Sequence, residues 1–271
     1  MKILLIGDIV GNPGRTAMAR VATRWKATGK ADAVVANAEN AAAGRGITAA
    51  LAEELLAGGA DVLTMGDHVW DQKDSLPYYD RAERVVRGLN FPPGCPGRGE
   101  VTIQVPGGTL TVIQLIGRTF MNPTVDCPFR TIDAWLKRCG GCGSGRAVIV
   151  DFHAEATSEK IAMGHFLDGR VTALVGTHTH VQTADEAVWK GGMAYITDLG
   201  MTGPCDGVIG RATDPIVRRF MTGLPAKFDI ATGDVRLHGA GLTVDMKTGR
   251  ASAIRRVEER SPGSDASEVL R

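Results

Sequence analysis

The sequence predicts an α/β protein built on a mostly parallel β-sheet that helices cover. Up to Gly200, short apolar runs typical of buried strands alternate with stretches that have the spacing of amphipathic helices. Polar residues follow several of these runs directly, where the carboxyl end of a parallel strand is expected. The chain has 271 residues, of which 44% are hydrophobic and 23% charged, so it can bury a full core without disulfides or other staples.

The first part of the chain supplies three strands and two helices with recognisable ends. Asn12 and Pro13 form a good N-cap and first-turn pair for a helix that Gly29 ends. Thr48 can cap a second helix, which Gly58-Gly59 closes. The expected strands are Lys2–Ile6, Ala33–Ala36 and Asp61–Met65, and the expected helices are Pro13–Ala27 and Ala49–Ala57.

The middle of the chain begins with an expected β-hairpin and returns to strand–helix alternation. Pro106-Gly107-Gly108 separates two apolar runs, as a hairpin turn does. Thr131 can cap a helix, and a later helix is expected to pack Ile161 and Phe166 inward. Strands are expected over Val101–Val105, Leu110–Leu115, Ala147–Val150, Ala173–Val175 and Ala194–Ile196, and helices over Thr131–Arg138 and Ser158–Leu167.

The alternation weakens after Gly200. Asp214-Pro215 opens a short helix to about Met221. We find no internal repeat, low-complexity block or clear linker, so we expect a single domain over residues 1–258 and a polar, frayed tail over residues 259–271. Three runs near the end predict an antiparallel meander over Asp234–Leu237, Leu242–Asp245 and Ala253–Glu258.

The net charge and the cysteine pattern limit the classes of binding partner and the cellular compartment that we expect. The formal net charge of +1 favours neither nucleic acid nor an anionic membrane, and no run reaches the roughly 18 apolar residues of a membrane span. The five cysteines are odd in number and scattered, which argues against a disulfide framework. Cys139 and Cys142 have CxxC spacing without a second pair, so we interpret them as incidental thiols. We expect a cytoplasmic protein with no membrane or stable nucleic-acid partner, and a homo-oligomer stays open.

Five expected strands end in side chains that can bind metals, and four of the six histidines occupy these ends. His165 lies within an expected helix instead, and we interpret it as a surface or packing residue. Carboxylates and imidazoles without thiolates suit Mn, Fe or Zn. Three histidines, three carboxylates and one amide are too many for one four-coordinate ion but suffice for two ions that share a carboxylate. The candidate ligands are Asp8, Glu39, Asn40, Asp67, His153, His178 and His180.

Two of these histidines lie within Gly176-Thr177-His178-Thr179-His180. On an extended strand they would point the same way and serve one ion, whereas in a polar turn they would be ordinary surface residues. The chain has no Gly-x-Ser-x-Gly elbow and no Walker loop, so a metal-activated water is the expected nucleophile.

These motifs together resemble the calcineurin-type metallophosphoesterases, and within them the YmdB-like group of bacterial proteins. The opening Lys2–Arg15 and the stretch Ala38–Thr48 match this group closely, and the resemblance covers roughly residues 1–258. It implies a four-layer αββα sandwich and a two-metal phosphodiesterase that acts on 2′,3′-cyclic nucleotides. The motif blocks are Gly7-Asp8, Glu39-Asn40, Gly66-Asp67-His68, His153 and Gly176–His180.

Two positions depart from the pattern of the wider superfamily. Val10 stands where most members carry a histidine, and Asn40 is the natural replacement ligand, as in the YmdB-like group. Asp67 stands where asparagine is usual. Asp8, Glu39 and Asp67 then total −3 against +4 for two divalent ions. We therefore expect tighter metal binding, or a more oxidised metal, and weaker anion binding than asparagine would give.

The resemblance also implies roles. A hydroxide that bridges the two metals attacks phosphorus, and His68 protonates the leaving ribose oxygen. His178 and His180 serve different ions, so a turn after Val175 must break the strand. Fe or Mn is expected, with Zn or Mg as alternatives. One ion takes Asp8, Glu39, Asn40 and His180, and the other takes Glu39, Asp67, His153 and His178, with Glu39 as the bridge.

Substrate contacts are less defined. Arg45 lies in a glycine-rich loop after two candidate ligands, where it can meet a phosphate oxygen or remain a solvated arginine. Alternative functions are a phosphomonoesterase or other two-metal ester hydrolase, and a regulatory protein that senses a nucleotide through a retained metal site. Weaker candidates are Arg118, Asn122 and Asp126 for substrate contact, Thr202-Gly203 at the border of the cleft, and Trp70, Tyr78 and Tyr79 for base stacking.

Overall fold

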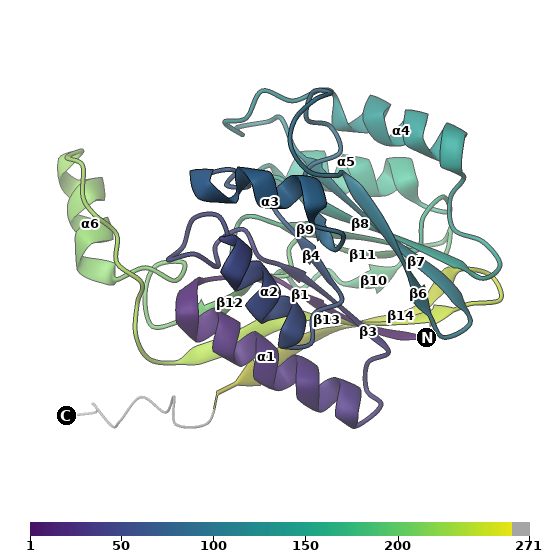
Figure 1. Cartoon of the computed structure of the whole chain (residues 1–271), viewed down its shortest axis with the longest axis horizontal. Coiled ribbons are helices and arrows are strands. Elements are labelled where there is room, and N and C mark those ends of the chain that lie inside the picture. The colour runs from purple at the N-terminus through teal and green to yellow at the C-terminus, as the bar shows by residue number, and fades with distance from the viewer. Residues whose placement is uncertain (262–271) are drawn as a thin grey trace.

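The computed structural model describes residues 1–261 and shows two β-sheets packed face to face between two layers of helices (Figure 1). Helices α1 (Gly11–Ala27) and α2 (Ala49–Ala57) cover the outer face of the first sheet. Helices α4 (Pro128–Cys139) and α5 (Thr157–Leu167) cover the outer face of the second. This arrangement confirms the four-layer αββα sandwich.

The first sheet has eight strands. They are β1 (Lys2–Ile6), β2 (Asp8–Ile9), β3 (Ala33–Asn37), β4 (Val62–Thr64), β5 (Val85–Val86), β12 (Met201–Pro204), β13 (Val235–Asp245) and β14 (Arg250–Arg260). The order is β2-β12-β13-β1-β3-β4-β5, and β14 pairs with β13. Strands β1, β3, β4 and β5 are mutually parallel, so their carboxyl ends lie at one edge of the sheet.

The second sheet has six strands. They are β6 (Glu100–Val105), β7 (Gly108–Ile116), β8 (Arg146–His153), β9 (Ala173–Thr177), β10 (Ala187–Val188) and β11 (Ala194–Ile196). The order is β10-β11-β9-β8-β7-β6, and β7, β8, β9 and β11 are parallel. The expected hairpin is confirmed, because β6 and β7 pair antiparallel through a short turn.

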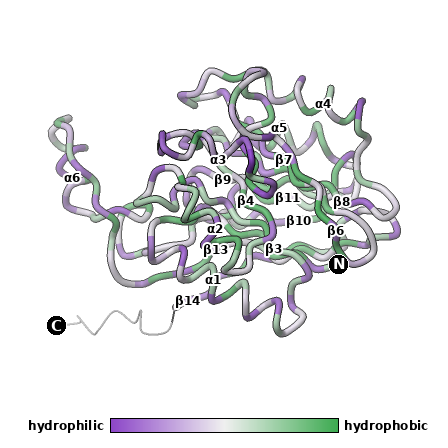
Figure 2. The backbone as a smooth tube through the Cα atoms, viewed as in Figure 1, coloured by the Kyte–Doolittle hydropathy of each residue, from purple (hydrophilic) through white to green (hydrophobic). Residues whose placement is uncertain are grey.

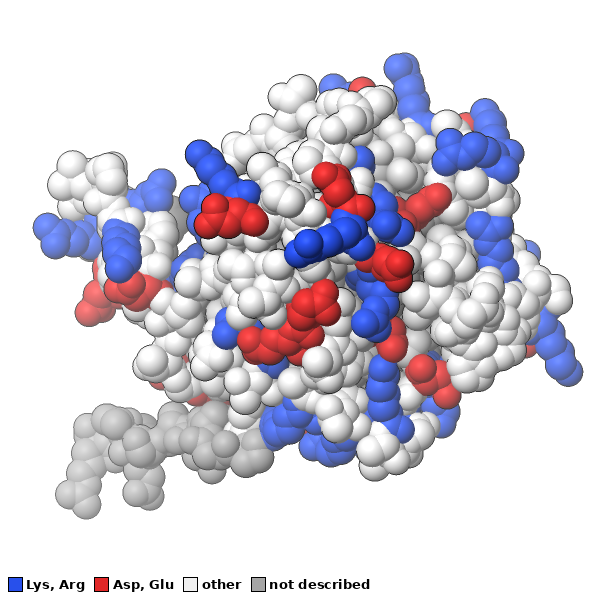
Figure 3. Space-filling view, viewed as in Figure 1, with Lys and Arg blue, Asp and Glu red and all other residues white. Residues whose placement is uncertain are grey.

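Alternating side chains divide the core into an inner layer and two outer layers. Along β8, Ala147 and Ile149 face the first sheet, whereas Val148 and Val150 pack against α4 and α5. Figure 2 shows the hydrophobic residues concentrated in the central strands. Acidic and basic side chains are interspersed over the face in Figure 3, in agreement with the net charge of +1.

Two helices begin earlier than the sequence predicts. Helix α1 begins at Gly11 with Val10 at its N-cap, and Asn12 instead accepts a hydrogen bond from Arg15. Packing fixes this start, because a Cβ on Gly14 would lie 2.2 Å from the Thr202 carbonyl oxygen. Helix α4 begins with a proline at N1, which places the expected cap inside the first turn. The cap assignments of Asn12 and Thr131 are therefore wrong, whereas Thr48 caps α2 as expected.

The inward face of α5 also differs from the prediction. Ile161 and Phe166 are 42% and 36% exposed, so their inward assignment is wrong. The buried positions are Lys160, Met163, Gly164 and Leu167, which have the i, i+3, i+4, i+7 spacing of one helix face. A lysine occupies this face because it forms a buried ion pair with Asp198, with 2.8 Å between Nζ and Oδ2.

The end of the chain forms two long strands in place of the expected three. The first two predicted runs belong to one strand, β13, because Gly239 lets it pass close to β1. A Cβ at Gly239 would lie 2.1 Å from the Leu5 carbonyl oxygen. Strand β14 extends to Arg260, and Trp25 donates a hydrogen bond to Glu259. The tail therefore does not begin at residue 259, and we propose that the domain extends to Arg260; residues 262–271 lie outside the described chain.

Two short helical elements and one projecting helix complete the fold. A 3-10 turn (Lys73–Ser75) and α3 (Leu76–Arg81) follow β4, and α6 (Thr213–Thr222) extends away from the sandwich in Figure 1. Among residues 1–261, every helix lacks the combination of length and apolar character that a bilayer span requires.

The ion pair beneath the sheet ends should contribute strongly to stability. We expect Lys160→Met to lower the free energy of unfolding by about 3–5 kcal/mol, because it leaves the Asp198 carboxylate buried without its cation. Adding Asp198→Asn should recover part of this loss. Urea unfolding measures both effects. Lys137→Met is the control, since Lys137 is 76% exposed and solvent screens its ion pair with Asp133. Equal effects of the two lysine substitutions would contradict this account.

Candidate metal centre

The candidate ligands converge because the strand ends of both sheets meet at one edge of the sandwich. Asp8 lies in β2, and Glu39 and Asp67 follow β3 and β4 of the first sheet. His153 ends β8, and His178 follows β9 of the second sheet. The sequence predicts the strand ends, and the face-to-face packing of two sheets explains how ligands from distant segments approach one another.

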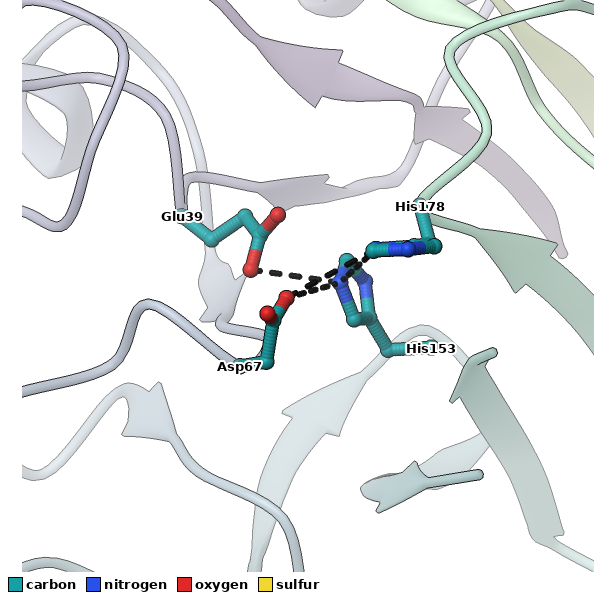
Figure 4. Close-up of side chains that lie close together, drawn as sticks. All are labelled: Glu39, Asp67, His153 and His178. Carbon is teal, nitrogen blue, oxygen red and sulfur yellow. Dashed lines mark hydrogen bonds and ion pairs between the residues drawn. The ribbon is translucent and has the colours of Figure 1, made fainter. Parts of the chain in front are cut away.

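The first cluster contains Glu39, Asp67, His153 and His178 (Figure 4). His153 Nε2 lies 3.2 Å from both Glu39 Oε2 and Asp67 Oδ1. His178 Nδ1 lies 3.0 Å from His153 Nε2. Donors bound at about 2.0–2.2 Å to one tetrahedral ion lie roughly 3.4 Å apart, so these separations suit a single metal.

The second cluster contains Asp8, Glu39 and His180, with Asn40 beside it. His180 Nε2 lies 3.1 Å from Asn40 Oδ1 and 3.9 Å from Asp8 Oδ1. Asp8 Oδ1 is buried and has no hydrogen-bond partner among the described residues. A cation would satisfy this oxygen, which otherwise costs free energy to bury. Both donor sets therefore fit metal ions, and Glu39 belongs to both.

The backbone of the Gly176–His180 stretch sends its two histidines to different clusters. Strand β9 continues to Thr177, so the turn begins two residues later than expected. His178 and His180 have φ angles of +100° and +65°, which place both in a region that non-glycine residues rarely adopt. Strain of this kind persists where surrounding contacts hold it, and it is concentrated at functional sites. The strict strand geometry that would aim both histidines at one ion is absent from this stretch.

A polar partner lies at the second ring nitrogen of each of the three histidines. Thr177 donates its hydroxyl proton to Asp151, at 2.7 Å, and therefore accepts from His153 Nδ1, at 2.9 Å. His180 Nδ1 donates to the Ile209 carbonyl oxygen at 3.2 Å. The cluster-facing nitrogens, His153 Nε2 and His180 Nε2, are thus the ones that can bind metal once they carry no proton.

His178 follows the same arrangement with an acidic partner. Its Nε2 lies 3.2 Å from Glu155 Oε2, which leaves Nδ1 toward the cluster. Sequence reasoning missed Asp151, Thr177, Ile209 and Glu155 as supporting residues. Asp151 carried a usable signal, because it precedes His153 by two residues on one strand and so shares its face. The other three depend on contacts between distant segments or on loop geometry.

The buried charges shift one another's ionisation. Burial raises the pKa of Asp8 to about 8, although the attraction of His153 opposes this rise. Burial also opposes ionisation of Asp67, but its hydrogen bonds with His153 and His178 outweigh burial and hold its pKa well below the usual range. The neighbouring carboxylates likewise outweigh burial at His153 and raise its pKa. Bound cations would take over this neutralisation, so metal binding should release protons.

His68 and Arg45 lie at the mouth of the site, and both contact Asp71. The His68 backbone N–H donates to Glu39 Oε2 at 3.3 Å, and His68 Nδ1 lies 3.1 Å from Asp71 Oδ2. Arg45 Nε lies 3.0 Å from the same oxygen. Asp71 was not recognised in the sequence, although it follows His68 by three residues. Asp71 therefore orients both His68 and Arg45.

A cavity of about 680 Å³ opens over both clusters, and His68, Arg45 and Glu155 line it. A second cavity of about 510 Å³ lies on the other side of His68, with Asn122 and Trp70 in its wall. The remaining weak candidates lie elsewhere: Tyr78 and Tyr79 are buried in the core, Thr202 is buried within β12, and Arg118 and Asp126 line a separate pocket. His165 packs against Trp189 and takes no part in the site, as expected.

The sandwich and the carboxylate–histidine clusters at its strand ends define the class of this protein. It is a calcineurin-type metallophosphoesterase, as the sequence motifs indicate. The chain belongs to the YmdB-like protein family, whose family model matches residues 4–257. A Bacillus subtilis (strain 168) relative, described as a 2′,3′-cyclic-nucleotide 2′-phosphodiesterase, is 44% identical over 257 residues, which cover 95% of this chain and 96% of the relative.

Two solved structures share this fold over nearly the whole chain. A Thermus thermophilus protein has a TM-score of 0.89 at 40% identity, covering 97% of this chain and 100% of that one. A Mycoplasma pneumoniae protein described as a novel phosphatase has a TM-score of 0.90 at 32% identity, covering 96% of this chain and 93% of that one.

Gly66 allows the first cluster to close. A Cβ at this position would lie 1.8 Å from Glu39 Oε2 and 2.5 Å from His153 Nε2. We expect Gly66→Ala to weaken metal binding by at least about tenfold, because it displaces groups around two candidate ligands. Manganese titration and elemental analysis of the purified protein measure this. Gly143→Ala is the matched control, since within residues 1–261 its added Cβ would meet no atom within 4 Å apart from its chain neighbours. Unchanged metal binding in Gly66→Ala would contradict the assignment.

Proposed function

We propose that this protein is a two-metal phosphodiesterase that hydrolyses 2′,3′-cyclic nucleotides. The observation that carries the proposal is the pair of donor clusters that share Glu39 beneath one cavity. The substrate class is supported by the description of the Bacillus subtilis relative at 44% identity. When bound, two ions would polarise the phosphoryl oxygens and activate a water as the nucleophile.

The proposed ligands divide between the two ions by their geometry. Glu39 is proposed as the bridge, because its carboxylate belongs to both donor sets. Thiolates take no part in either set, which favours Fe or Mn, with Zn or Mg as alternatives. One proposed set is Asp8, Glu39, Asn40 and His180, and the other is Glu39, Asp67, His153 and His178.

His68 is proposed as the general acid. It lines the cavity beside the clusters, while its backbone rather than its side chain contacts Glu39. Its Nδ1 lies 3.1 Å from Asp71 Oδ2, so in the imidazolium form Nε2 is the nitrogen that can give a proton to the leaving ribose oxygen. Arg45 is a weaker proposal for phosphate contact, because its guanidinium already pairs with Asp71.

A cytoplasmic location is part of the same proposal. All five cysteines are free thiols, which suits a reducing compartment. The substrate is then a small intracellular phosphodiester rather than a polymer, because the cavity of about 680 Å³ has the size of a small-molecule site.

Phosphomonoester hydrolysis is the second candidate, since a Mycoplasma pneumoniae relative at 35% identity is described as a putative phosphatase/phosphodiesterase. A substrate panel separates the two. We expect Mn- or Fe-loaded protein to hydrolyse 2′,3′-cyclic nucleotides faster than nucleoside monophosphates or a generic aryl phosphodiester. Faster monoester hydrolysis would favour the phosphatase, whereas tight nucleotide binding without turnover would favour a sensing protein.

Removing the proposed acid should slow the reaction without emptying the site. We expect His68→Ala to lower kcat by about 10²–10⁴-fold, the usual contribution of general acid catalysis, with metal content unchanged. Steady-state kinetics and elemental analysis of one preparation measure both. His165→Ala, which alters a histidine remote from the cavity, should leave both values unchanged. Loss of metal from His68→Ala would show that His68 is a ligand instead.

A further inference from the structure

Phe228 is an aromatic residue that lies outside the hydrophobic core. It follows α6 and lines the cavity above the two clusters. Among the described residues, the three hydrophobic clusters of the sandwich do not include it. The Arg219 guanidinium lies over its ring, with 5.2 Å between Cζ and the ring centroid. A partly exposed aromatic side chain beside a polar site calls for a role other than packing.

Arg211 joins the segment that contains Phe228 to the loop that follows Asn40. Its Nη1 donates to the carbonyl oxygens of Ala43 and Phe228, at 3.0 and 3.2 Å, and its Nη2 donates to that of Gly44 at 2.7 Å. Asn40, a candidate ligand, donates to the same Gly44 oxygen at 3.1 Å. Phe228 is therefore held at a fixed position relative to the site.

Gly44 makes this close approach possible. Its φ angle is +88°, and a Cβ there would lie 2.0 Å from Arg211 Nη2, so any other residue would disturb the contact. The loop that follows Asn40 therefore requires a glycine at position 44, because Arg211, which also donates to the Phe228 carbonyl oxygen, lies directly against it.

Ile209 brings a second apolar side chain to the same cavity. Its φ angle is +45°, a strained value for a β-branched residue, and it is 49% exposed. Its carbonyl oxygen accepts the hydrogen bond from His180 Nδ1. The strain is therefore located where the backbone supports a candidate ligand and the side chain faces the cavity.

The second cavity offers no comparable aromatic face. Its Trp70 packs against Phe91, with ring centroids 4.6 Å apart, and both rings also pack on the core of the first sheet. Among the described residues that line the two cavities, Phe228 is the aromatic ring outside the core clusters. A ring face that core packing does not use is therefore available at Phe228 rather than at Trp70.

We infer that Phe228, with Ile209 and the Arg219 guanidinium, forms the subsite for the nucleobase of a cyclic nucleotide whose phosphate lies over the metal clusters. Aromatic rings and planar guanidinium groups both stack on bases, without selecting among them. This inference rests on the proposed function and adds to it the residues that distinguish a nucleotide from a simple cyclic phosphate.

The test compares substrates with and without a base. The probes are 2′,3′-cyclic AMP and methyl ribofuranoside 2′,3′-cyclic phosphate, used with the metal-loaded full chain. We expect Phe228→Ala to lower kcat/KM for the nucleotide by about tenfold, which corresponds to about 1.4 kcal/mol, mainly through KM. The base-free probe should react at the wild-type rate, which also shows that the variant is folded. Calorimetric binding of adenosine 3′-monophosphate should weaken by a similar factor.

Two variants serve as controls. Phe228→Trp retains a stacking face and should keep the wild-type preference for the nucleotide. Phe220→Ala alters an aromatic residue that is 84% exposed on α6 and does not line the cavity, so it should change neither probe.

Each other outcome overturns the inference in a distinguishable way. Equal losses on both probes, or no loss on the nucleotide, would remove the base subsite while leaving the proposed function intact. A nucleotide-specific loss in Asn122→Ala but not in Phe228→Ala would move the base to the second cavity. Wild-type protein that hydrolyses neither probe would overturn the proposed function and the subsite with it.

Discussion

The burial of three carboxylates in one small volume is the constraint on which the rest of the structure depends. Asp8 and Glu39 are fully buried and Asp67 nearly so, and isolated buried carboxylates cost far too much free energy to retain without compensation. His153 supplies one positive partner, and the unpartnered Asp8 Oδ1 marks where compensation is incomplete among the described residues. Two divalent ions would supply a charge of +4 against the −3 of the three carboxylates. The side chains of the two clusters are therefore arranged to bind cations rather than to neutralise one another.

The surrounding scaffold holds these groups in conformations they would not adopt alone. The buried Lys160 ammonium donates to the Thr177 carbonyl oxygen, and Asp198 accepts the Thr179 N–H, so one ion pair fixes both sides of the strained His178. Asp151 and Thr177 fix the ring of His153 from behind. Groups that line the cavity are held in the same way, because Arg211 links the loop after Asn40 to the segment of Phe228. Preorganisation of this kind lets a site bind ions and substrate without first paying to order its ligands.

The sequence predicts the parts of this site that follow from local rules. Strand ends such as those before Asp8, Glu39 and His153 are visible as apolar runs, and parallel strands bring such ends together. The αββα arrangement came from the motif resemblance, because periodicity cannot divide strands between two sheets. Contacts across the fold were missed for a physical reason. The inward Lys160 violates the rule that lysines are exposed. The Asp71–Arg45 ion pair and the hydrogen bond from Arg211 to Phe228 join residues that are distant in the chain.

The most direct test of the central claim is the position of the metals themselves. A crystal structure of manganese-loaded protein, with anomalous scattering to identify the ions, should show two ions bridged by Glu39. His178 should bind the ion shared with Asp67 and His153, and His180 the ion shared with Asp8 and Asn40. A single ion, or one ion bound by both His178 and His180, would contradict the account.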